Sequence, residues 1–263
     1  MFTCLAFNKF ANGGVYALET KDGLIIETTD TFLPWYTKDA VGSKQNTLKD
    51  SDLGSRLERW MIGVSVMHGC PCKCKFCATG QMPKWAVLTA EEIVAQVDFI
   101  LDTNPEFDPM SAKEFKINYT RMGEPFLNLE NVKQAIAILD KRYNGKIHHY
   151  VSTIGVKDSD FSWIKGNITL QISLHSLDKK RRNKLIPWRG KMSIEELGKI
   201  RTQSNLMTTL NLTLVDEDDF DIEELQKFFD PKYFFIKLSP INRNAVSDKN
   251  ALGKGIIEAR NIA

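Results

Sequence analysis

From residue 60 onward, short apolar segments alternate with amphipathic ones. The apolar segments, rich in β-branched and aromatic residues, predict six strands: 60–66, 114–119, 147–153, 168–175, 207–215 and 233–241. Helical spacing of hydrophobic residues between them predicts helices at 89–101, 129–143, 193–204 and 221–229, and a short one at 158–165. Repeated strand–helix units imply a parallel sheet with its functional loops at the carboxyl ends of the strands. Eight units close a full barrel, so six predict an α/β fold with a partial (βα)6 TIM-type barrel.

The segment before residue 60 has a different pattern. Two runs of β-forming residues flank the turn signal Lys21-Asp22-Gly23, which predicts a small N-terminal β-hairpin extension over 13–29. The polar stretch 36–55 is expected to be a loop. The chain is therefore expected to divide into an N-terminal β extension and loop at 1–59, the barrel at 60–243 and a C-terminal tail at 244–263, in which no element is predicted.

Composition places the chain in a broad class. Of its 263 residues, 43% are hydrophobic and 26% are charged, which is typical of a globular protein with one sizeable core. No apolar run approaches the roughly 20 residues that span a bilayer, so no membrane partner is expected. The first residues lack the charged leader and apolar stretch of a signal peptide. A cytoplasmic location is therefore expected.

The charge distribution is more informative than the net charge of +2. Lysines and arginines are concentrated at 178–191, together with Trp188, whereas an acidic run lies at 216–225. The basic segment has two interpretations of similar weight. It could hold phosphates, with the tryptophan available for base stacking, or it could be a solvated helix face followed by a loop.

Four of the five cysteines lie within eight positions: Cys70, Cys72, Cys74 and Cys77. Disulfides are disfavoured because the count is odd, secretory features are lacking and the alternating cysteines are too close to pair without strain. A structural zinc site normally takes two pairs of ligands, and the sequence has no second pair. His148 and His149 cannot supply it, because neighbours on a strand point to opposite faces.

The spacing C-x3-C-x2-C of Cys70, Cys74 and Cys77 instead suits a four-iron, four-sulfur cluster that leaves one iron open. An open iron is a place where a cofactor can bind, so this metal site is expected to be a reaction site. Phe76 is positioned to shield such a cluster from water, and Cys72 is expected to be a bystander.

Beyond these cysteines, four further motifs occur in order, each after a predicted strand: "MGEPFLNLENV", "VSTIG", "ISLHSLDKKRRNKLIP" and "LSPIN". The upstream hairpin "LETKDGLIIETT" is a fifth motif. With "GCPCKCKFCATGQMPKWAVLTAEEIVAQV", they resemble the radical S-adenosylmethionine (SAM) superfamily, in particular the radical-SAM adenine methyltransferases of ribosomal and transfer RNA. The resemblance covers about residues 14–243.

The resemblance implies a [4Fe-4S] cluster whose open iron is chelated by SAM. It implies reductive cleavage of SAM to a 5′-deoxyadenosyl radical, with an electron donor of the flavodoxin or ferredoxin type. The family's SAM contacts fall on Gly123, Glu124, Ser152, Ser173, Leu174, His175 and Asn242. Glu27 falls where the family has a glutamate that accepts a proton from the substrate; an exposed strand carboxylate is the alternative.

The sequence also departs from this family. Gly63 stands where the methyltransferases have one catalytic cysteine, no cysteine follows Cys77, Arg121 replaces a glycine, and the N-terminal helical domain is missing from the sequence. We therefore expect a radical SAM enzyme that abstracts hydrogen from an unidentified substrate, with a nucleotide or an RNA base as candidates. RNA adenine methylation by a modified route, and a non-catalytic cluster- or SAM-binding protein, are the alternatives.

Overall fold

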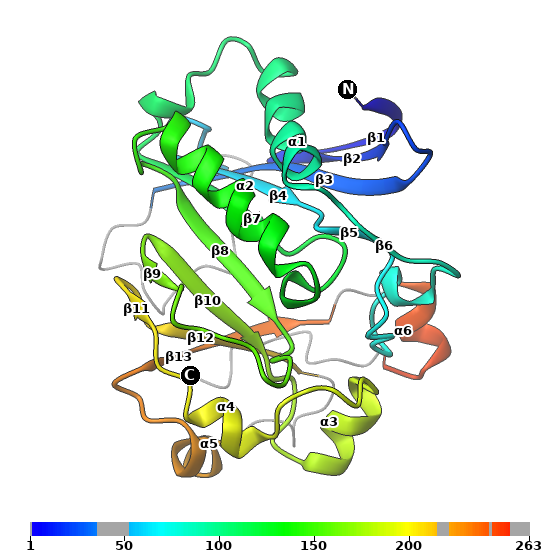
Figure 1. Cartoon of the computed structure of the whole chain (residues 1–263), viewed down its shortest axis with the longest axis vertical. Coiled ribbons are helices and arrows are strands. Elements are labelled where there is room, and N and C mark those ends of the chain that lie inside the picture. Colours follow the sequence, from blue (N-terminus) through cyan, green and yellow to red (C-terminus); the bar gives the residue numbers. More distant parts are fainter. Residues whose placement is uncertain (1, 36–52, 215–220, 242–243, 253–263) are drawn as a thin grey trace.

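The computed structural model of the chain describes residues 2–35, 53–214, 221–241 and 244–252 (Figure 1). A sheet of nine strands runs through this part of the molecule in the order β1-β2-β3-β4-β7-β8-β10-β12-β13. The first and last strands of this order are not paired with each other in the described residues, so the sheet is an open barrel.

The six predicted barrel strands are all present and pair in parallel as neighbours in chain order. They are β4 (Arg59–Val64), β7 (Glu114–Tyr119), β8 (His148–Thr153), β10 (Ile168–Ser173), β12 (Thr208–Leu214) and β13 (Phe234–Pro240). The connections contain α1 (Ala90–Asp102), α2 (Leu129–Arg142), α3 (Lys179–Leu185), α4 (Ile194–Gly198) and α5 (Ile222–Phe228). The partial barrel is confirmed.

The N-terminal extension continues the same sheet. The predicted hairpin is formed by β2 (Gly13–Glu19) and β3 (Ile25–Leu33), and β3 pairs antiparallel with β4. A further strand, β1 (Thr3–Phe10), precedes them and was not predicted. All of its residues are exposed, so it lacks the alternation of buried and exposed positions by which a strand is recognised in a sequence.

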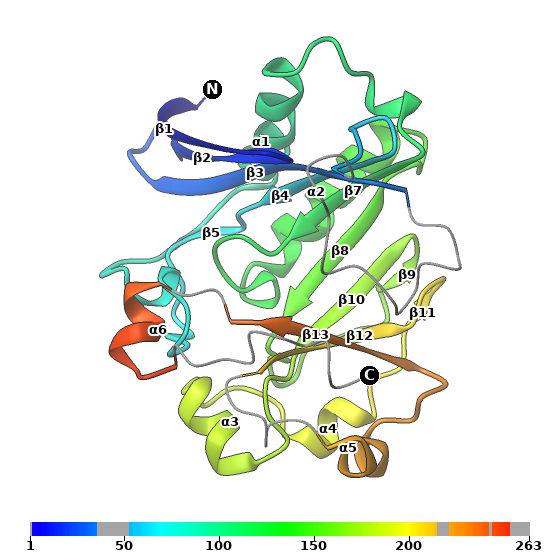
Figure 2. The ribbon, with the colours of Figure 1, turned by 180° about the vertical axis from the view of Figure 1, so that it is seen from behind.

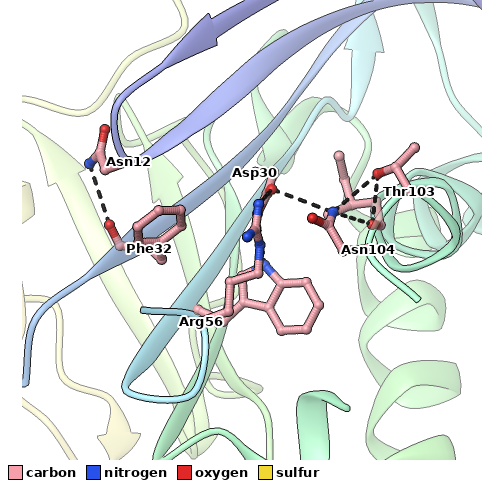
Figure 3. A network of polar contacts seen from close by, with 8 residues as sticks. Asn12, Asp30, Phe32, Arg56, Thr103 and Asn104 are labelled. Atoms are coloured by element: carbon pink, nitrogen blue, oxygen red, sulfur yellow. Dashed lines mark hydrogen bonds and ion pairs between the residues drawn. The ribbon is translucent and has the colours of Figure 1, made fainter. Parts of the chain in front are cut away.

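A buried carboxylate joins this extension to the barrel (Figure 3). Asp30 of β3 is 1% exposed and forms an ion pair with Arg56. It also accepts hydrogen bonds from the indole of Trp60 (2.8 Å) and the amide of Asn104 (3.5 Å), which follows α1. Because every oxygen of this buried charge has a partner, the contact can be stable inside the protein.

The two faces of the parallel strands differ in chemistry. Side chains such as Ile62, Val64 and Ile117 point towards α1 and α2 and are fully buried with Ile93 and Val97 of α1. Alternate residues point to the other face, here called the inner face. By strand register this face carries Gly63, Asn118, Tyr150, Ser152, Gln171, Ser173, Asn211 and Lys237. The inner face is therefore polar, which suits ligand binding better than core packing.

Smaller elements hold the loops of the barrel. Two short ribbons pair β5 (Met67–His68) with β6 (Ala86–Val87), and β9 (Lys165–Gly166) with β11 (Gln203–Ser204). Short 3-10 turns occur at Thr79–Gln81, Pro109–Ser111 and Pro125–Leu127. A last helix, α6 (Ala245–Lys249), lies in the tail, where no element was predicted.

Two predicted helices differ from the structure. Residues 158–165 form turns instead of a helix, because Asp160 accepts hydrogen bonds from the backbone and hydroxyl of Ser162 (2.8 and 2.9 Å) and so competes with helical bonding. The helix expected at 193–204 ends at Gly198. A side chain there would lie 2.1 Å from the carbonyl oxygen of Phe228, and the chain then continues into β11.

None of the helices in the described residues is both long and apolar enough to span a bilayer.

Candidate active site

The four clustered cysteines lie on the loop that follows β4 and β5, at the carboxyl end of the first parallel strand. The ribbon of β5 and β6 closes the base of this loop, where Gly69 has φ +65° and a side chain would lie 2.3 Å from the carbonyl oxygen of Lys84. The tip is held by the backbone of Lys75, which donates to the carbonyl of Leu185 (2.9 Å). The loop is therefore fixed at both its base and its tip.

The tail supplies two more contacts to the same loop. The side-chain amides of Asn244 and Asn250 donate to the carbonyls of Phe76 and Lys75, each at 3.0 Å. Figure 1 shows α6, which these asparagines flank, beside the cyan segment that follows β5. Sequence reasoning missed both residues, although Asn244 and Ser247 form a capping box whose spacing is visible in the sequence.

The surroundings of the cysteines fit an iron–sulfur cluster. All are free thiols, and Cys72 and Cys74 are buried with Ile154, Leu185 and Ile186 in an apolar group to which Phe76 and Trp188 also belong. A dry, apolar shell is what tunes such clusters. Among the described side chains, no three from His, Cys, Asp and Glu surround a single-ion position. The ligand set Cys70, Cys74 and Cys77 remains a prediction.

The four thiols have different electrostatic environments. A hydrogen bond from Cys72 lowers the pKa of the Cys70 thiol, and the same bond together with burial raises the pKa of Cys72. Burial, with the charges of Cys77 and Cys70, raises the pKa of Cys74. That Cys72 is a bystander beside the ligand set remains a prediction.

The loop after β7 carries Gly123 and Glu124. Gly123 has φ +100°, and a side chain there would lie 2.6 Å from Cβ of Met67, so glycine lets this loop pack against the base of the cysteine loop. Glu124 is 3% exposed, and its two carboxylate oxygens accept hydrogen bonds from the backbone of Phe126 (3.1 Å) and Ile154 (2.9 Å). The carboxylate therefore connects the loops after β7 and β8.

Burial raises the pKa of Glu124 to about 7, against the lowering effect of the hydrogen bonds from Thr153, Ile154 and Phe126. A carboxyl group with this pKa is ready to become charged when a cation binds beside it.

The predicted cofactor residues of β8 and β10 lie at neighbouring strand ends. Ser152 pairs with Gln171, two residues before Ser173, so the two serine side chains are on the inner face of adjacent strands. Leu174 has its side chain in the core, and its backbone N–H donates to Asn211 (3.0 Å). Of these three predicted cofactor residues, the two serines therefore have their side chains on the inner face, and Leu174 does not.

His175 contacts the cysteine loop directly. Its ring packs edge-on against Phe76 with 4.7 Å between ring centroids, and its Nδ1 accepts a hydrogen bond from the backbone of Thr213 (3.2 Å). Burial, with the nearby charge of Arg182, lowers the pKa of His175 to about 3. The imidazole is thus neutral and positions Phe76. Asn242, the remaining predicted cofactor residue, lies outside the described residues.

Glu27 lies beside the same loops, on β3. Its carboxylate forms an ion pair with Arg121, and each of the two side chains is about a third exposed. The backbone of Glu27 is joined to Ser65, whose hydroxyl also accepts from the backbone of Met122 (3.2 Å). Glu27 is therefore held at the rim formed by β4 and the loop after β7.

Gly63 and Arg121, two positions where the sequence departs from the methyltransferases, contact each other. A side chain built on Gly63 would lie 2.9 Å from Cδ of Arg121 and 2.4 Å from the hydroxyl of Thr29. The arginine stem therefore uses the space that the missing side chain on β4 leaves open. The guanidinium at the end of this stem is the group that pairs with Glu27.

Because of this contact, the effects of substitutions at Gly63 and Arg121 are expected to be coupled. Gly63→Ala should destabilise the chain by about 1–3 kcal/mol through overpacking, and by clearly less in the Arg121→Gly background. Urea unfolding of both single variants and the double variant measures a coupling free energy, expected to exceed about 0.5 kcal/mol. Additive effects of the two substitutions would show that they do not share this space.

Comparisons with known proteins identify the family of this chain. Residues 64–229 match a family model described as the Radical SAM superfamily. The chain is 35% identical over 191 residues to a "Probable dual-specificity RNA methyltransferase RlmN" of Pseudothermotoga lettingae, covering 68% of the chain and 54% of that protein. A protein of the same description from Chlorobaculum tepidum is 32% identical over 236 residues, covering 84% and 62%.

The chain thus spans only about half to three fifths of these relatives. A solved structure, a radical SAM methyltransferase from Sphaerobacter thermophilus, shares the fold: its TM-score is 0.65 at 21% identity, over 96% of this chain and 74% of that one. The family model matches well over half of the chain, from the end of β4 to α5, and this span includes the cysteine loop and the loops after β7, β8 and β10. The chain therefore belongs to the radical SAM superfamily of enzymes.

Proposed function

We propose that the chain binds a [4Fe-4S] cluster through Cys70, Cys74 and Cys77, and SAM through the neighbouring loops, and abstracts hydrogen from a nucleotide or an RNA base at the inner face. When bound, these cofactors supply reductive cleavage of SAM to a 5′-deoxyadenosyl radical. The main observation that supports this proposal is that the loops after β5, β7, β8 and β10 contact one another at one end of the barrel. A one-electron donor of the flavodoxin or ferredoxin type completes the proposal.

Each candidate site residue has a defined role in this proposal. Glu124 accepts a hydrogen bond from the ammonium of the methionine part, and its buried position makes that pairing strong. Ser152 and Ser173 donate or accept hydrogen bonds at the ribose or adenine from the inner face. Asn242 is assigned the same role by its position in the motif. His175 holds Phe76 over the cysteine loop and so helps to exclude water.

Glu27 is proposed as the group that accepts a proton from the substrate. Its pairing with Arg121 fixes the carboxylate at the rim. The exposed third of each side chain leaves the pair accessible to a substrate on the inner face.

A second candidate function is methylation of an adenine in RNA. It is favoured by the relatives, whose descriptions name them as RNA methyltransferases. Gly63 requires a modified route, because the position on β4 where that family has a catalytic cysteine carries no thiol, and the aliphatic stem of Arg121 occupies the space.

One experiment separates these functions. The chain is reconstituted anaerobically with iron and sulfide and incubated with dithionite and methyl-labelled SAM, with and without RNA. The proposal expects 5′-deoxyadenosine from the unmodified chain and none from Cys74→Ala. Label in RNA would support the methyltransferase. Bound cluster and SAM without either product would show a non-catalytic binding protein and refute both.

A further inference from the structure

A basic pocket of about 380 Å³ lies on the outside of the barrel rim, between α3 and α4. The two helices are side by side at the lower edge of the molecule in Figures 1 and 2. The pocket is lined by Lys157, Lys179, Arg182, Asn183, Pro187, Arg189, Lys191, Met192, Ser193 and Ile194. Five of these side chains are cationic, and the lining within the described residues includes no carboxylate and no aromatic ring.

The walls of the basic pocket are joined by backbone hydrogen bonds. Lys157 donates to the carbonyl of Gly190 (2.8 Å), and Met192 donates to that of Gly155 (2.7 Å). Gly155 has φ +79°, and a side chain there would lie 2.4 Å from Leu197. Lys157, Arg189 and Lys191 are thereby carried on two segments that are fixed side by side, so the cluster of charges does not depend on loose side-chain positions alone.

These cations are only partly compensated. Lys179 forms an ion pair with Glu195, and Lys157 acts on the exposed Glu196. Among the described residues, neither Arg189 nor Lys191 forms an ion pair. Burial and the charge of Arg182 lower the pKa of Lys191, as expected where positive charges are crowded. The pocket therefore offers a site for an anion.

The basic pocket is connected to the candidate active site through Arg182. This guanidinium is 2% exposed and donates to the carbonyls of Leu174 (3.3 Å), Ile154 (2.8 Å) and Met192 (2.9 Å). Ile154 in turn donates to Glu124, and Leu174 lies among the predicted SAM residues. Leu185 and Ile186, at the end of α3, pack against the cysteine loop. An anion bound here would be close to the rim without entering the site itself.

We propose that the basic pocket binds a backbone phosphate of an RNA strand whose target base reaches the inner face. Lysine and arginine clusters of this kind hold phosphates and position the strand without reading its sequence. Trp188 packs against the cysteine loop and does not line the pocket, so the proposed phosphate site does not include its indole ring. This proposal depends on the proposed function in one respect, which is that the bound partner is RNA.

The test compares two charge-matched double variants of the full reconstituted chain, kept anaerobic. Lys157→Gln with Arg189→Gln removes two pocket charges. Lys180→Gln with Lys184→Gln removes two exposed charges from α3 that do not line the pocket. The probe is a labelled single-stranded RNA oligonucleotide, titrated by fluorescence anisotropy at several salt concentrations. The pocket variant should bind about tenfold more weakly, with a salt slope smaller by about 1.4, and the control variant should change less than about twofold.

Three results would overturn the proposal. Equal losses in both variants would show diffuse charge attraction. Binding of inorganic phosphate that is lost in the pocket variant but leaves bound RNA in place would show a site for small anions. Unchanged RNA binding with slower reduction by a flavodoxin would assign the pocket to an acidic protein. 5′-Deoxyadenosine formation without RNA is measured in the same variants, so a failure of the pocket is distinguishable from a failure of the proposed enzyme activity.

Discussion

Cys74→Ala should leave the reconstituted chain with almost none of the about four irons that the unmodified chain binds, and so should Cys70→Ala and Cys77→Ala. Cys72→Ala should retain most of its iron. The reason is the spacing: Cys70, Cys74 and Cys77 have the C-x3-C-x2-C spacing of cluster ligands, and Cys72 lies outside it. Iron and acid-labile sulfide analysis, with the visible absorbance of the cluster, gives the measurement.

The four variants control for one another, because each removes one thiol from the same fixed loop. Circular dichroism of the chain without metal checks that the fold survives each substitution. A Cys72→Ala chain without iron, beside a Cys70→Ala chain that still holds it, would reverse the assignment of ligand and bystander.

Glu124→Gln should change the pH dependence of stability, because it removes a buried carboxyl group whose pKa is raised. The folded-state pKa of Glu124, about 7, lies above the unfolded value of about 4.5, so the folded state holds a proton that the unfolded state releases. The stability contributed by this proton is fully present below about pH 4.5 and is lost as pH rises to about 7. The loss amounts to about 1.4 kcal/mol per pH unit, and the variant should not show it.

The readout is the difference in unfolding free energy between the Glu124→Gln variant and the unmodified chain. The difference is needed because His175, present in both, changes stability with pH in the opposite direction. Its pKa of about 3 in the folded state makes stability rise with pH up to about 6.5, where the free imidazole loses its proton. Urea unfolding of the metal-free chains at pH 5, 6, 7 and 8 should therefore show Glu124→Gln gaining on the unmodified chain up to about pH 7. Parallel curves would mean that the buried carboxyl does not titrate in this range.

The sequence was sufficient for the parallel strands because they are buried on one face by helices and appear as short apolar runs. Ile62, Val64 and Ile117 belong to such runs, and all three are fully buried. The cysteine spacing was equally local, since all four clustered cysteines lie within eight positions of the sequence. The Glu27 hairpin was predicted from a turn signal of three residues.

What could not be predicted depends on contacts between distant segments. The ion pair of Glu27 with Arg121 joins residues 94 positions apart, and nothing in either local pattern selects the other. The helix expected at 158–165 failed because Asp160 satisfies the backbone locally. The grouping of Lys157 with Arg189 and Lys191 arises from two backbone hydrogen bonds between loops, so a basic run in the sequence became a pocket only through folding.

The asparagines of the tail have a consequence for the order of assembly. Asn244 and Asn250 hold the carbonyls of Phe76 and Lys75, yet they are synthesised after all six parallel strands. The cysteine loop, which emerges early from the ribosome, therefore reaches its final set of contacts only once residues 244–250 have joined it. Iron delivered during synthesis would therefore meet a loop that still lacks these two hydrogen bonds.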